Sequence, residues 1–439
     1  MLNNLPLNWC ECKLGDVFHT SSGGTPSRRE TAYYGGNIPW LKSGELNDGI
    51  ISEAEEFITK EGLENSSAKI FPKGSILLAL YGATVGKIGI LDFDSATNQA
   101  VCCIYSNPYF DKNLLFYYLL SQRKHLINQG KGGAQPNISQ DIVKNLVLPL
   151  PPLAEQERIV EKIEALFAGI DEGVERLKSA QAQIKQYRQS VLKSAFEGKL
   201  YKTTDWKEVK LENIISNEKY AMKRGPFGSS LKKEFFVPVG IRVFEQYNPI
   251  NNDPYWARYF ITKEKYKELY AFRAGPRDLL ISCSGTLGKI LELPADVEEG
   301  IINQALLKIS LNNKKISNQF FIYWFNSNQT QKLILENVRG AAIQNIASVK
   351  ELKQISILLP TISEQQHIVA EIEKRFAVAD ELEKAVNEGL EKADELKQFI
   401  LKKAFEGKLA PQNPNDEPAS VLLDRIKASK QPQSKGKKK

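Results

Sequence analysis

Histidine, cysteine and methionine are scarce in this chain, whose 439 residues include three histidines, five cysteines and two methionines. An odd number of cysteines, two of them adjacent as Cys102-Cys103, does not make a disulfide framework. Cys10 and Cys12 lack zinc-site spacing, and few histidines are left to complete one. We therefore expect no metal site in this chain. No Ser-His-Asp or Cys-His arrangement stands out either, so we expect no catalytic residues.

Long apolar runs are also missing. The most apolar stretch, residues 75–91, is interrupted by glycines and by Lys87, so the sequence predicts no membrane-spanning helix. No basic and apolar leader opens the chain, and 42% hydrophobic with 25% charged residues is typical of a globular protein. These features predict a cytoplasmic protein without a membrane partner.

The positive charge is unevenly distributed. Residues 1–145 carry 13 basic and 14 acidic side chains, a net charge of −1, whereas residues 201–354 carry 23 and 16, a net charge of +7. Charge alone therefore supports nucleic-acid binding in the second half and leaves the first half undecided. The residues from Pro411 onward are basic overall, and we expect residues 411–439 to form a disordered tail.

Two motifs resemble catalytic signatures without satisfying them. Gly82–Lys87 has three residues between its glycines where a phosphate-binding loop needs four, and Ile88 stands where that loop has Ser or Thr. Asn107-Pro108-Tyr109 and Asp253-Pro254-Tyr255 lack the second proline of the amino-methyltransferase motif. We interpret all of these segments as turns.

The strongest positive signal is an internal repeat. Residues 146–200 recur without gaps as residues 355–409, with 21 identities in 55 positions, and both copies end in Phe-Glu-Gly-Lys-Leu. The repeat means that the chain is built twice. Such a chain can offer similar surfaces to a partner with approximate two-fold symmetry, such as duplex DNA or a pair of identical subunits.

Each repeat predicts a long helix. Apolar or small residues recur at steps of three and four, which is a heptad pattern, and about 40 residues at 1.5 Å each make a rod of roughly 60 Å. Because one amphipathic rod is unstable alone in water, we expect the two to form an antiparallel coiled coil; packing of each on its own domain is the alternative. The residues predicted to pair the helices are Ile163, Leu166, Ile170, Leu177, Ile184, Val191, Ile372, Leu382, Val386, Leu396 and Ile400.

A globular stretch precedes each long helix. The runs Ser75–Leu80 and Asp278–Ser282 predict buried strands, and the aromatic segments Leu114–Gln122 and Gln319–Ser327 predict helices on the sheet. The fold class that follows is α/β: two globular domains, repeated with pseudo-two-fold symmetry, and two long α-helices. We place the boundaries at 1–150 and 201–358 for the domains, with helical spacers at 151–200 and 359–410.

A recognition surface is the remaining candidate for a site. Glycine-rich loops with arginines, lysines and tyrosines can approach a phosphate backbone, and Asn, Gln and Arg can read base edges. An ordinary surface loop is the alternative for each segment. The DNA-binding candidates of the first domain are Thr25, Arg28, Arg29, Tyr33, Tyr34, Lys42, Ser43, Lys87, Gln135 and Asn137. Those of the second domain are Lys223, Arg224, Ser229, Lys232, Lys233, Arg242, Gln246, Tyr247, Lys289, Gln344 and Asn345.

The ordered set of motifs resembles the specificity subunit of type I restriction-modification enzymes. The resemblance rests on Ser22–Pro26, Ile38-Pro39-Trp40, Gly82–Gly89 with Asn98-Gln99, the Pro151…Glu155-Gln156 helix start and the two Phe-Glu-Gly-Lys-Leu ends. It implies two target recognition domains that each read one half of an interrupted site in double-stranded DNA. It also implies that the paired helices set the spacing and dock two methyltransferase subunits.

By the same resemblance, the chain is a non-catalytic subunit required for both modification and restriction. S-adenosylmethionine, ATP and Mg²⁺ are then expected in the partner subunits, which include restriction and translocase subunits, and no cofactor is expected in this chain. Two other functions stay open: a stand-alone DNA methyltransferase whose motifs have diverged, and a structural coiled-coil adaptor. Methyl transfer by the chain alone would favour the first, and absence of sequence-selective DNA protection would favour the second.

Overall fold

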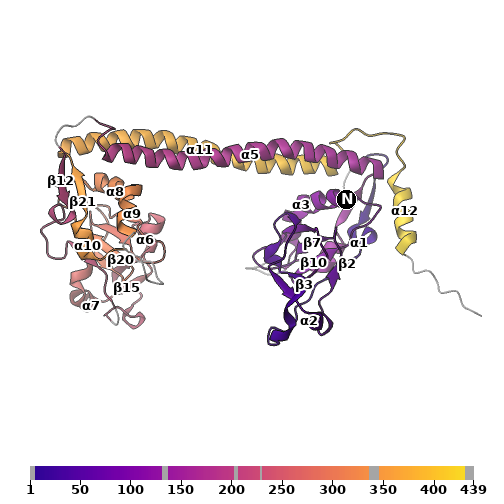
Figure 1. Ribbon diagram of the computed structural model, residues 1–439, viewed down its shortest axis with the longest axis horizontal. Helices are drawn as coiled ribbons and strands as arrows, with labels where there is room; N and C mark the ends of the chain where they lie inside the picture. Colours follow the sequence, from indigo (N-terminus) through magenta and orange to yellow (C-terminus); the bar gives the residue numbers. More distant parts are fainter. Residues whose placement is uncertain (1–4, 131–136, 202–205, 228–229, 336–345, 431–439) are drawn as a thin grey trace, which may run out of the picture. The chain divides into compact units, whose positions relative to one another are not determined.

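The computed structural model describes residues 5–130, 137–201, 206–227, 230–335 and 346–430. The chain divides into two compact units, which are Met1–Arg176 with Gly389–Lys439, and Leu177–Glu388. The division falls inside two long helices, α5 (Leu153–Phe196) and α11 (Ile362–Phe405) (Figure 1). Each unit therefore contains a globular domain together with one part of each long helix.

The globular domain of unit 1 contains three sheets. A five-stranded sheet has the order β2-β10-β7-β8-β4, a four-stranded sheet has the order β5-β3-β9-β6, and β1 pairs with β11. The strands are β1 (Cys10–Lys13), β2 (Thr20–Ser22), β3 (Tyr34–Leu41), β4 (Gly49–Ile51), β5 (Glu56–Ile58), β6 (Ile70–Phe71), β7 (Ile76–Ala79), β8 (Ile88–Leu91), β9 (Ser95–Thr97), β10 (Val101–Ile104) and β11 (Val147–Leu150). The helices are α1 (Leu14–Val17), α2 (Lys60–Glu64), α3 (Lys112–Gln129) and α4 (Gln140–Lys144).

The globular domain of unit 2 repeats this plan, and its described residues contain no counterpart of β4. Its sheets have the orders β13-β20-β17-β18 and β15-β14-β19-β16, and β12 pairs with β21. The strands are β12 (Lys207–Lys210), β13 (Met222–Arg224), β14 (Ile241–Phe244), β15 (Tyr259–Ile261), β16 (Arg273–Ala274), β17 (Leu279–Ser282), β18 (Ile290–Glu292), β19 (Gly300–Ile302), β20 (Leu306–Ile309) and β21 (Ser356–Leu359). The helices are α6 (Tyr247–Asn251), α7 (Lys263–Glu268), α8 (Asn318–Asn326), α9 (Asn328–Leu335) and α10 (Val349–Gln354).

The elements predicted from sequence are present in both domains. Strands β7 and β17 occupy the predicted apolar runs, and every residue of each is buried. Helices α3 and α8 cover the predicted aromatic segments. Each begins at a side-chain cap, since Asp111 accepts from the N–H groups of Asn113 and Leu114, and Ser317 accepts from that of Phe320. The mixed α/β class is confirmed.

The segments that resemble catalytic motifs are turns. Residues 80–87 connect β7 to β8, with Gly82 and Gly86 at φ angles of 90° and 79°, which favour glycine. The side chain of Asn107 accepts from the N–H of Tyr109 at 2.9 Å, and that of Asp253 accepts from the N–H of Tyr255 at 3.0 Å. These short side-chain bonds explain why Asn or Asp precedes proline at both places.

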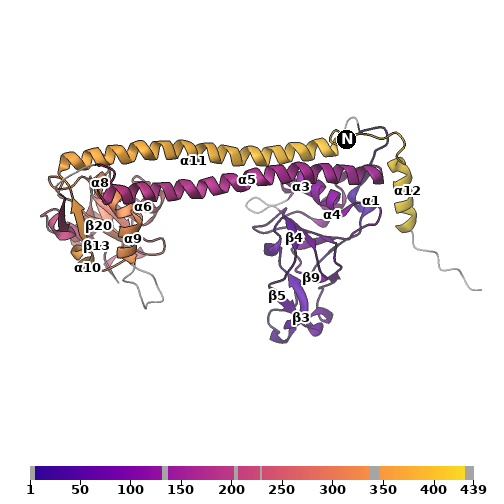
Figure 2. The same cartoon turned by 45° about the horizontal axis from the view of Figure 1, so that its top comes forward.

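The two long helices are antiparallel within each unit (Figure 2), and the same contacts recur at both places. In unit 2, Arg188 donates to Asp380 at 2.6 Å, and its guanidinium lies 5.3 Å from the centre of the Phe376 ring. In unit 1, Lys397 donates to Asp171, and its Nζ lies 5.2 Å from the ring centre of Phe167. Arg188 and Lys397 occupy the same position in the two repeats, and so do Asp171 with Asp380 and Phe167 with Phe376, because each pair is 209 residues apart. The duplication therefore preserves the pairing contacts. The antiparallel coiled coil is confirmed.

The heptad pattern predicts the packing of most, but not all, of these residues. Ile163, Ile184, Val191, Ile372, Val386 and Ile400 are buried, and Leu166 and Ile170 pack against the core of unit 1. Leu177 is half-buried. Leu382 and Leu396 keep 52% and 48% of their surface exposed, so burying them in the helix pair was a wrong expectation. A pair of helices encloses only a narrow stripe, and positions at its margin stay open unless a third element covers them.

The ends of the long helices belong to the domain cores. Ile159, Ile163 and Ile400 lie in one hydrophobic cluster with Leu114 and Tyr118 of α3. In unit 2, Val191, Ile368 and Ile372 share a cluster with side chains of α8. Both interpretations of the helices are therefore partly correct: they pair with each other, and they also pack on the globular domains.

The disordered tail predicted for residues 411–439 is wrong for its central part. Residues Ala419–Lys430 form helix α12, whose Leu422 and Ile426 are buried in the core of unit 1. The N–H of Ala419 donates to the carbonyl of Asn8 at 2.9 Å. The segment is basic overall, but Leu422 and Ile426 are apolar residues at helical spacing, which the composition alone does not reveal. Residues 431–439 lie outside the described residues.

Candidate nucleic-acid interface

The first candidate surface forms where two parallel strands end in unit 1. Strands β3 and β9 run parallel with Leu41 beside Thr97, and the N–H of Asn98 donates to the carbonyl of Leu41 at 2.9 Å. Residues 42–43 and 98–100 therefore emerge side by side. The β7–β8 turn joins them, because Thr84 Oγ1 donates to the carbonyl of Ser43 at 2.9 Å. We call residues 42–43, 81–87 and 98–100 the first edge.

Unit 2 builds the same arrangement, with Asn-Gln-Ala again after the parallel strand but Glu245-Gln246 in place of Lys42-Ser43. Strands β14 and β19 run parallel with Phe244 beside Ile302, and the N–H of Asn303 donates to the carbonyl of Phe244 at 3.0 Å. The N–H of Cys283 donates to the carbonyl of Ala305 at 2.7 Å, which brings the β17–β18 turn to the same place. We call residues 245–246, 283–289 and 303–305 the second edge.

A glycine lets the chain pass close to each edge. A Cβ on Gly23 would lie 2.3 Å from the carbonyl oxygen of Thr97, and one on Gly225 would lie 1.8 Å from that of Asn303. Both distances are too short for any other residue. The glycine-rich loop of the first domain is therefore held against the first edge, where Thr25 Oγ1 contacts Gln99.

Several predicted residues meet at these edges. Thr25, Lys42, Ser43 and Lys87 lie at the first edge, and Asn137 adjoins it because the next residue, Ile138, bonds to Leu80. Gln246 and Lys289 lie on the second edge, Arg224 reaches it through the carbonyl of Cys283, and Tyr247 follows it directly.

Other predicted residues have structural contacts. Arg28 forms two hydrogen bonds with Glu56, at 3.2 and 2.7 Å, and lies over the ring of Tyr34. The hydroxyl of Tyr34 donates to the carbonyl of Pro26 at 2.7 Å. The backbone of Tyr33 packs against Gly62. These side chains shape the loop that carries Thr25.

Arg242 is the clearest correction. It is buried in β14, and it donates to the carbonyls of Pro254 and Trp256 at 2.8 and 2.9 Å. It therefore supports the loop after α6 and does not offer its guanidinium to a base. The alternation of apolar and polar residues along β14 does not reveal that Arg242 is buried, because the carbonyls that bind it belong to a loop 12 and 14 residues further along the chain.

The remaining predicted residues are distributed over the surface or lie outside the description. Lys223 lies over the rings of Tyr220 and Phe272, and Lys232 pairs with Glu234 at 3.6 Å. Arg29 and Lys233 are exposed. Gln135, Ser229, Gln344 and Asn345 fall outside the described residues.

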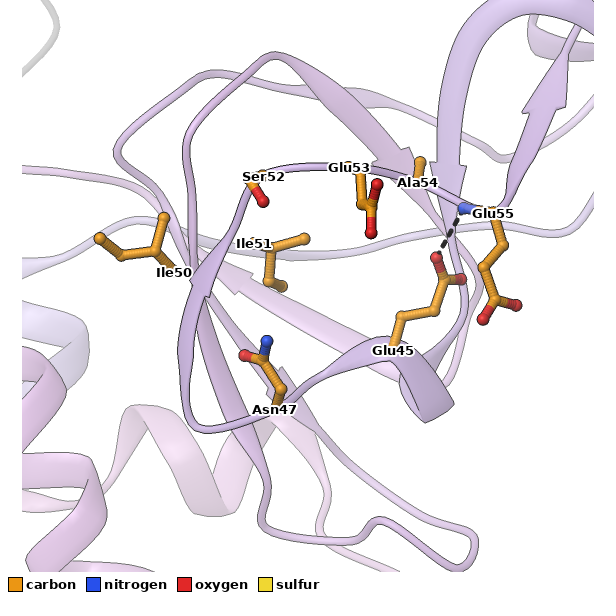
Figure 3. Close-up of a pocket in the computed structure, with 8 residues that line it drawn as sticks. All are labelled: Glu45, Asn47, Ile50, Ile51, Ser52, Glu53, Ala54 and Glu55. Atoms are coloured by element: carbon orange, nitrogen blue, oxygen red, sulfur yellow. Dashed lines mark hydrogen bonds between the residues drawn. The ribbon is translucent and has the colours of Figure 1, made fainter. Parts of the chain in front are cut away.

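An acidic pocket lies beside the first edge (Figure 3). Its lining includes Glu45, Glu53 and Glu55. Glu45 accepts from the N–H of Lys42 at 2.7 Å and from the N–H of Glu55 at 3.0 Å, so it clamps the turn after β3. A phosphate would be repelled by this cluster of carboxylates, which limits where a nucleic-acid backbone can lie on this face.

Two adjacent cysteines of unit 1 are buried. Burial raises the pKa of both Cys102 and Cys103 to about 12, which disfavours the thiolate that a nucleophile requires. Within the described ranges, no group of three or more His, Cys, Asp or Glu side chains is placed to hold a metal ion. No helix in these ranges is long and apolar enough to cross a membrane.

The fold and the two edges define a duplicated recognition scaffold, in which two α/β domains present equivalent polar edges and are joined to an antiparallel helix pair. Residues 6–179 and 203–392 match the family described as the type I restriction modification DNA specificity domain. The chain belongs to this family.

Similar proteins cover nearly the whole chain. The EcoBI specificity subunit of Escherichia coli is 30% identical over 94% of this chain and 88% of its own length. The StySPI specificity subunit of Salmonella potsdam is 25% identical over 97% and 96%. A chain from a solved type I restriction-modification system has a TM-score of 0.67 at 22% identity, covering 92% of this chain and all of that one, so it shares the fold.

The comparison of the domains also reveals a residue that sequence reasoning missed. Glu245 opens the second edge at the place that Lys42 holds on the first. The largely apolar strand β14 before it was a usable signal, because a polar residue directly after a buried strand emerges at a sheet edge.

Proposed function

We propose that this protein is the DNA sequence-specificity subunit of a type I restriction-modification complex, in which each domain reads one half of an interrupted target through its edge. The observation that carries the proposal is the duplicated edge. The same backbone bonds hold both edges, and Asn-Gln-Ala recurs on each, while Lys42-Ser43 on the first is replaced by Glu245-Gln246 on the second, as two readers of different half-sites require.

The long helices support a role in holding partner subunits. Leu396 and Phe399 of α11 are about half exposed in unit 1, and Val378 and Leu382 are similarly exposed in unit 2. Neighbouring exposed apolar side chains on a helix favour protein association. We infer that two methyltransferase subunits dock along the helix pair, and that the restriction and translocase subunits join through them.

The chemistry belongs to those partners in this proposal. S-adenosylmethionine, ATP and Mg²⁺ would bind in the methyltransferase and motor subunits, and this chain would select the sequence. The test is co-expression with the methyltransferase subunit, followed by mapping of methylated adenines across the host DNA. A single split motif is expected. Methylation by this chain alone would identify an enzyme, and a complex that forms without selective methylation or DNA protection would identify an adaptor.

Helix length would set the gap between half-sites. Each long helix has 44 residues, and a heptad inserted into both would add roughly 10 Å. The spacer of the methylated motif should then lengthen while both half-sites keep their sequence. The same seven residues inserted between Ala410 and Ala419, outside both long helices, serve as the control. A lengthened helix pair with an unchanged spacer would reject this role.

A further inference from the structure

One position has opposite charge in the two domains. Lys42 follows β3 directly and Glu245 follows β14 directly. Strand β3 runs parallel to β9, which Asn98 follows, and β14 runs parallel to β19, which Asn303 follows. The turn after each residue is held in the same way. The N–H of Lys42 donates to Glu45 Oε1 at 2.7 Å, and the N–H of Glu245 donates to Asn248 Oδ1 at 2.8 Å.

These bonds use only the backbone of Lys42 and Glu245. The turn is maintained by the side chain three residues later, so the side chains at positions 42 and 245 are not needed to form it. The duplicated scaffold therefore presents the end of a lysine on one edge and a carboxylate on the other. A structural role common to both domains does not explain this inversion.

Two side-chain acceptors on the second edge have no donor among the residues that the structure describes. Within the described residues, Glu245 Oε2 and Gln246 Oε1 are buried and have no hydrogen-bond partner. Buried polar atoms in native proteins are almost always bonded, so these two adjacent acceptors are suited to donors from outside the chain. Burial raises the pKa of the Glu245 carboxyl, and the positive charge of Arg258 opposes that rise.

The Lys42 side chain on the first edge can exchange its present partner for an acceptor on a ligand. Lys42 Nζ pairs with Glu55 at 3.2 Å, and the Glu55 side chain is 71% exposed. An exposed pair of this kind contributes little to stability, so a ligand acceptor can replace Glu55 at little cost. Lys42 can then donate outward from the edge.

We propose that positions 42 and 245 are equivalent specificity-determining positions that read opposite base chemistry. This inference rests on the proposed function. Lys42 donates to a base that presents acceptors in the major groove, as guanine does through O6 and N7. Glu245, with Gln246 beside it, accepts from an exocyclic amino group, as cytosine and adenine present. A carboxylate at a DNA interface is repelled by phosphates, so a base amino group is the donor that suits it.

The test uses the full chain co-expressed with its methyltransferase subunit, and it reads the methylated motif by sequencing. The variants are Glu245→Lys, Glu245→Ala and Lys42→Glu. Glu268→Lys and Lys60→Glu are matched controls, because each reverses an exposed charge of the same domain away from its edge. Both controls should leave the motif unchanged.

Each edge variant should alter one base position in one half-site. The preference for the original base should fall by roughly 10- to 100-fold, the discrimination that one good base contact provides. Glu245→Ala should relax the position, whereas Glu245→Lys should move it toward a base with acceptors. Lys42→Glu should change the other half-site.

The outcomes separate this inference from the proposed function. An unaltered chain that gives no split motif contradicts the proposed function. A split motif that stays unchanged in Glu245→Ala, Glu245→Lys and Lys42→Glu overturns this inference alone. If a variant complex does not methylate DNA, the purified complex is used to select bound sequences from randomised duplex DNA, and the base preference at the same position decides. Glu245→Ala keeps the backbone bond that forms the turn, so this variant tests the side chain alone.

Discussion

Replacing Ile426 of α12 with alanine should release this helix from unit 1. The Ile426 side chain is fully buried in the core cluster that includes Leu14 and Val17. Truncation of such a residue costs about 2–5 kcal/mol, through lost burial and the cavity that remains. A helix of 12 residues is unstable by itself in water, so its order depends on this docking.

Hydrogen exchange measured by mass spectrometry on peptides from residues 419–430 provides the assay. A loss of 2 kcal/mol corresponds to roughly 30-fold faster exchange if α12 opens as a unit. Val421→Ala is the matched control, because Val421 is 40% exposed on the same helix and should change stability by less than about 0.5 kcal/mol. If α12 amides of the unaltered chain exchange as fast as those of an unstructured peptide, the docked helix is refuted.

Three further predictions concern the helix pair, a buried carboxyl and an edge. Arg188→Met should lower the thermal midpoint less than Arg188→Ala, because methionine keeps the packing on Phe376 while ion pairs to carboxylates that are 65% and 45% exposed contribute only about 0–1 kcal/mol. Equal losses would contradict this. Burial raises the pKa of Glu155, so its contribution to stability is greatest at low pH and declines as pH rises through the raised pKa. Glu155→Gln should remove that decline in the unfolding midpoint measured against pH, and an unchanged pH profile would disprove the assignment. Gly23→Ala should abolish reading of one half-site, since its Cβ would meet a carbonyl oxygen at 2.3 Å. The control is Gly44→Ala, whose Cβ would have open space around it and which should leave the motif intact. Equal effects of the two substitutions would argue against the close approach at Gly23.

The sequence predicts the parts of the fold that depend on local pattern. The repeat implied two equivalent units, the apolar runs located β7 and β17, and the aromatic segments located α3 and α8. Each of these signals is complete within a short window. The turn at Gly82–Lys87 was equally accessible, because its glycines are local requirements for positive φ angles.

The parts that depend on distant contacts were not accessible. Arg242 is buried because the loop at Pro254–Trp256 supplies two carbonyls, and no local pattern announces that bond. The edges themselves arise when strands far apart in the sequence end side by side, such as β14 and β19. The equivalence of positions 42 and 245 depends on the same strand pairings, which no local pattern shows.

The α12 helix shows a different limit. Its basic surroundings predict a solvated tail, yet Leu422 and Ile426 at a spacing of four residues are enough to dock it. Composition averages over a segment, whereas packing depends on one face of a helix. A search for apolar periodicity inside charged segments would have found α12.

Exchange of one domain tests the central claim most directly. Residues 206–359 would be replaced by the corresponding domain of a relative with a different target, and the chimaera would be co-expressed with the methyltransferase subunit while methylated adenines are mapped. The account predicts that one half-site changes to that of the donor, while the other half-site and the spacer are retained. Methylation at an unchanged motif, or at a motif altered in both halves, would contradict it.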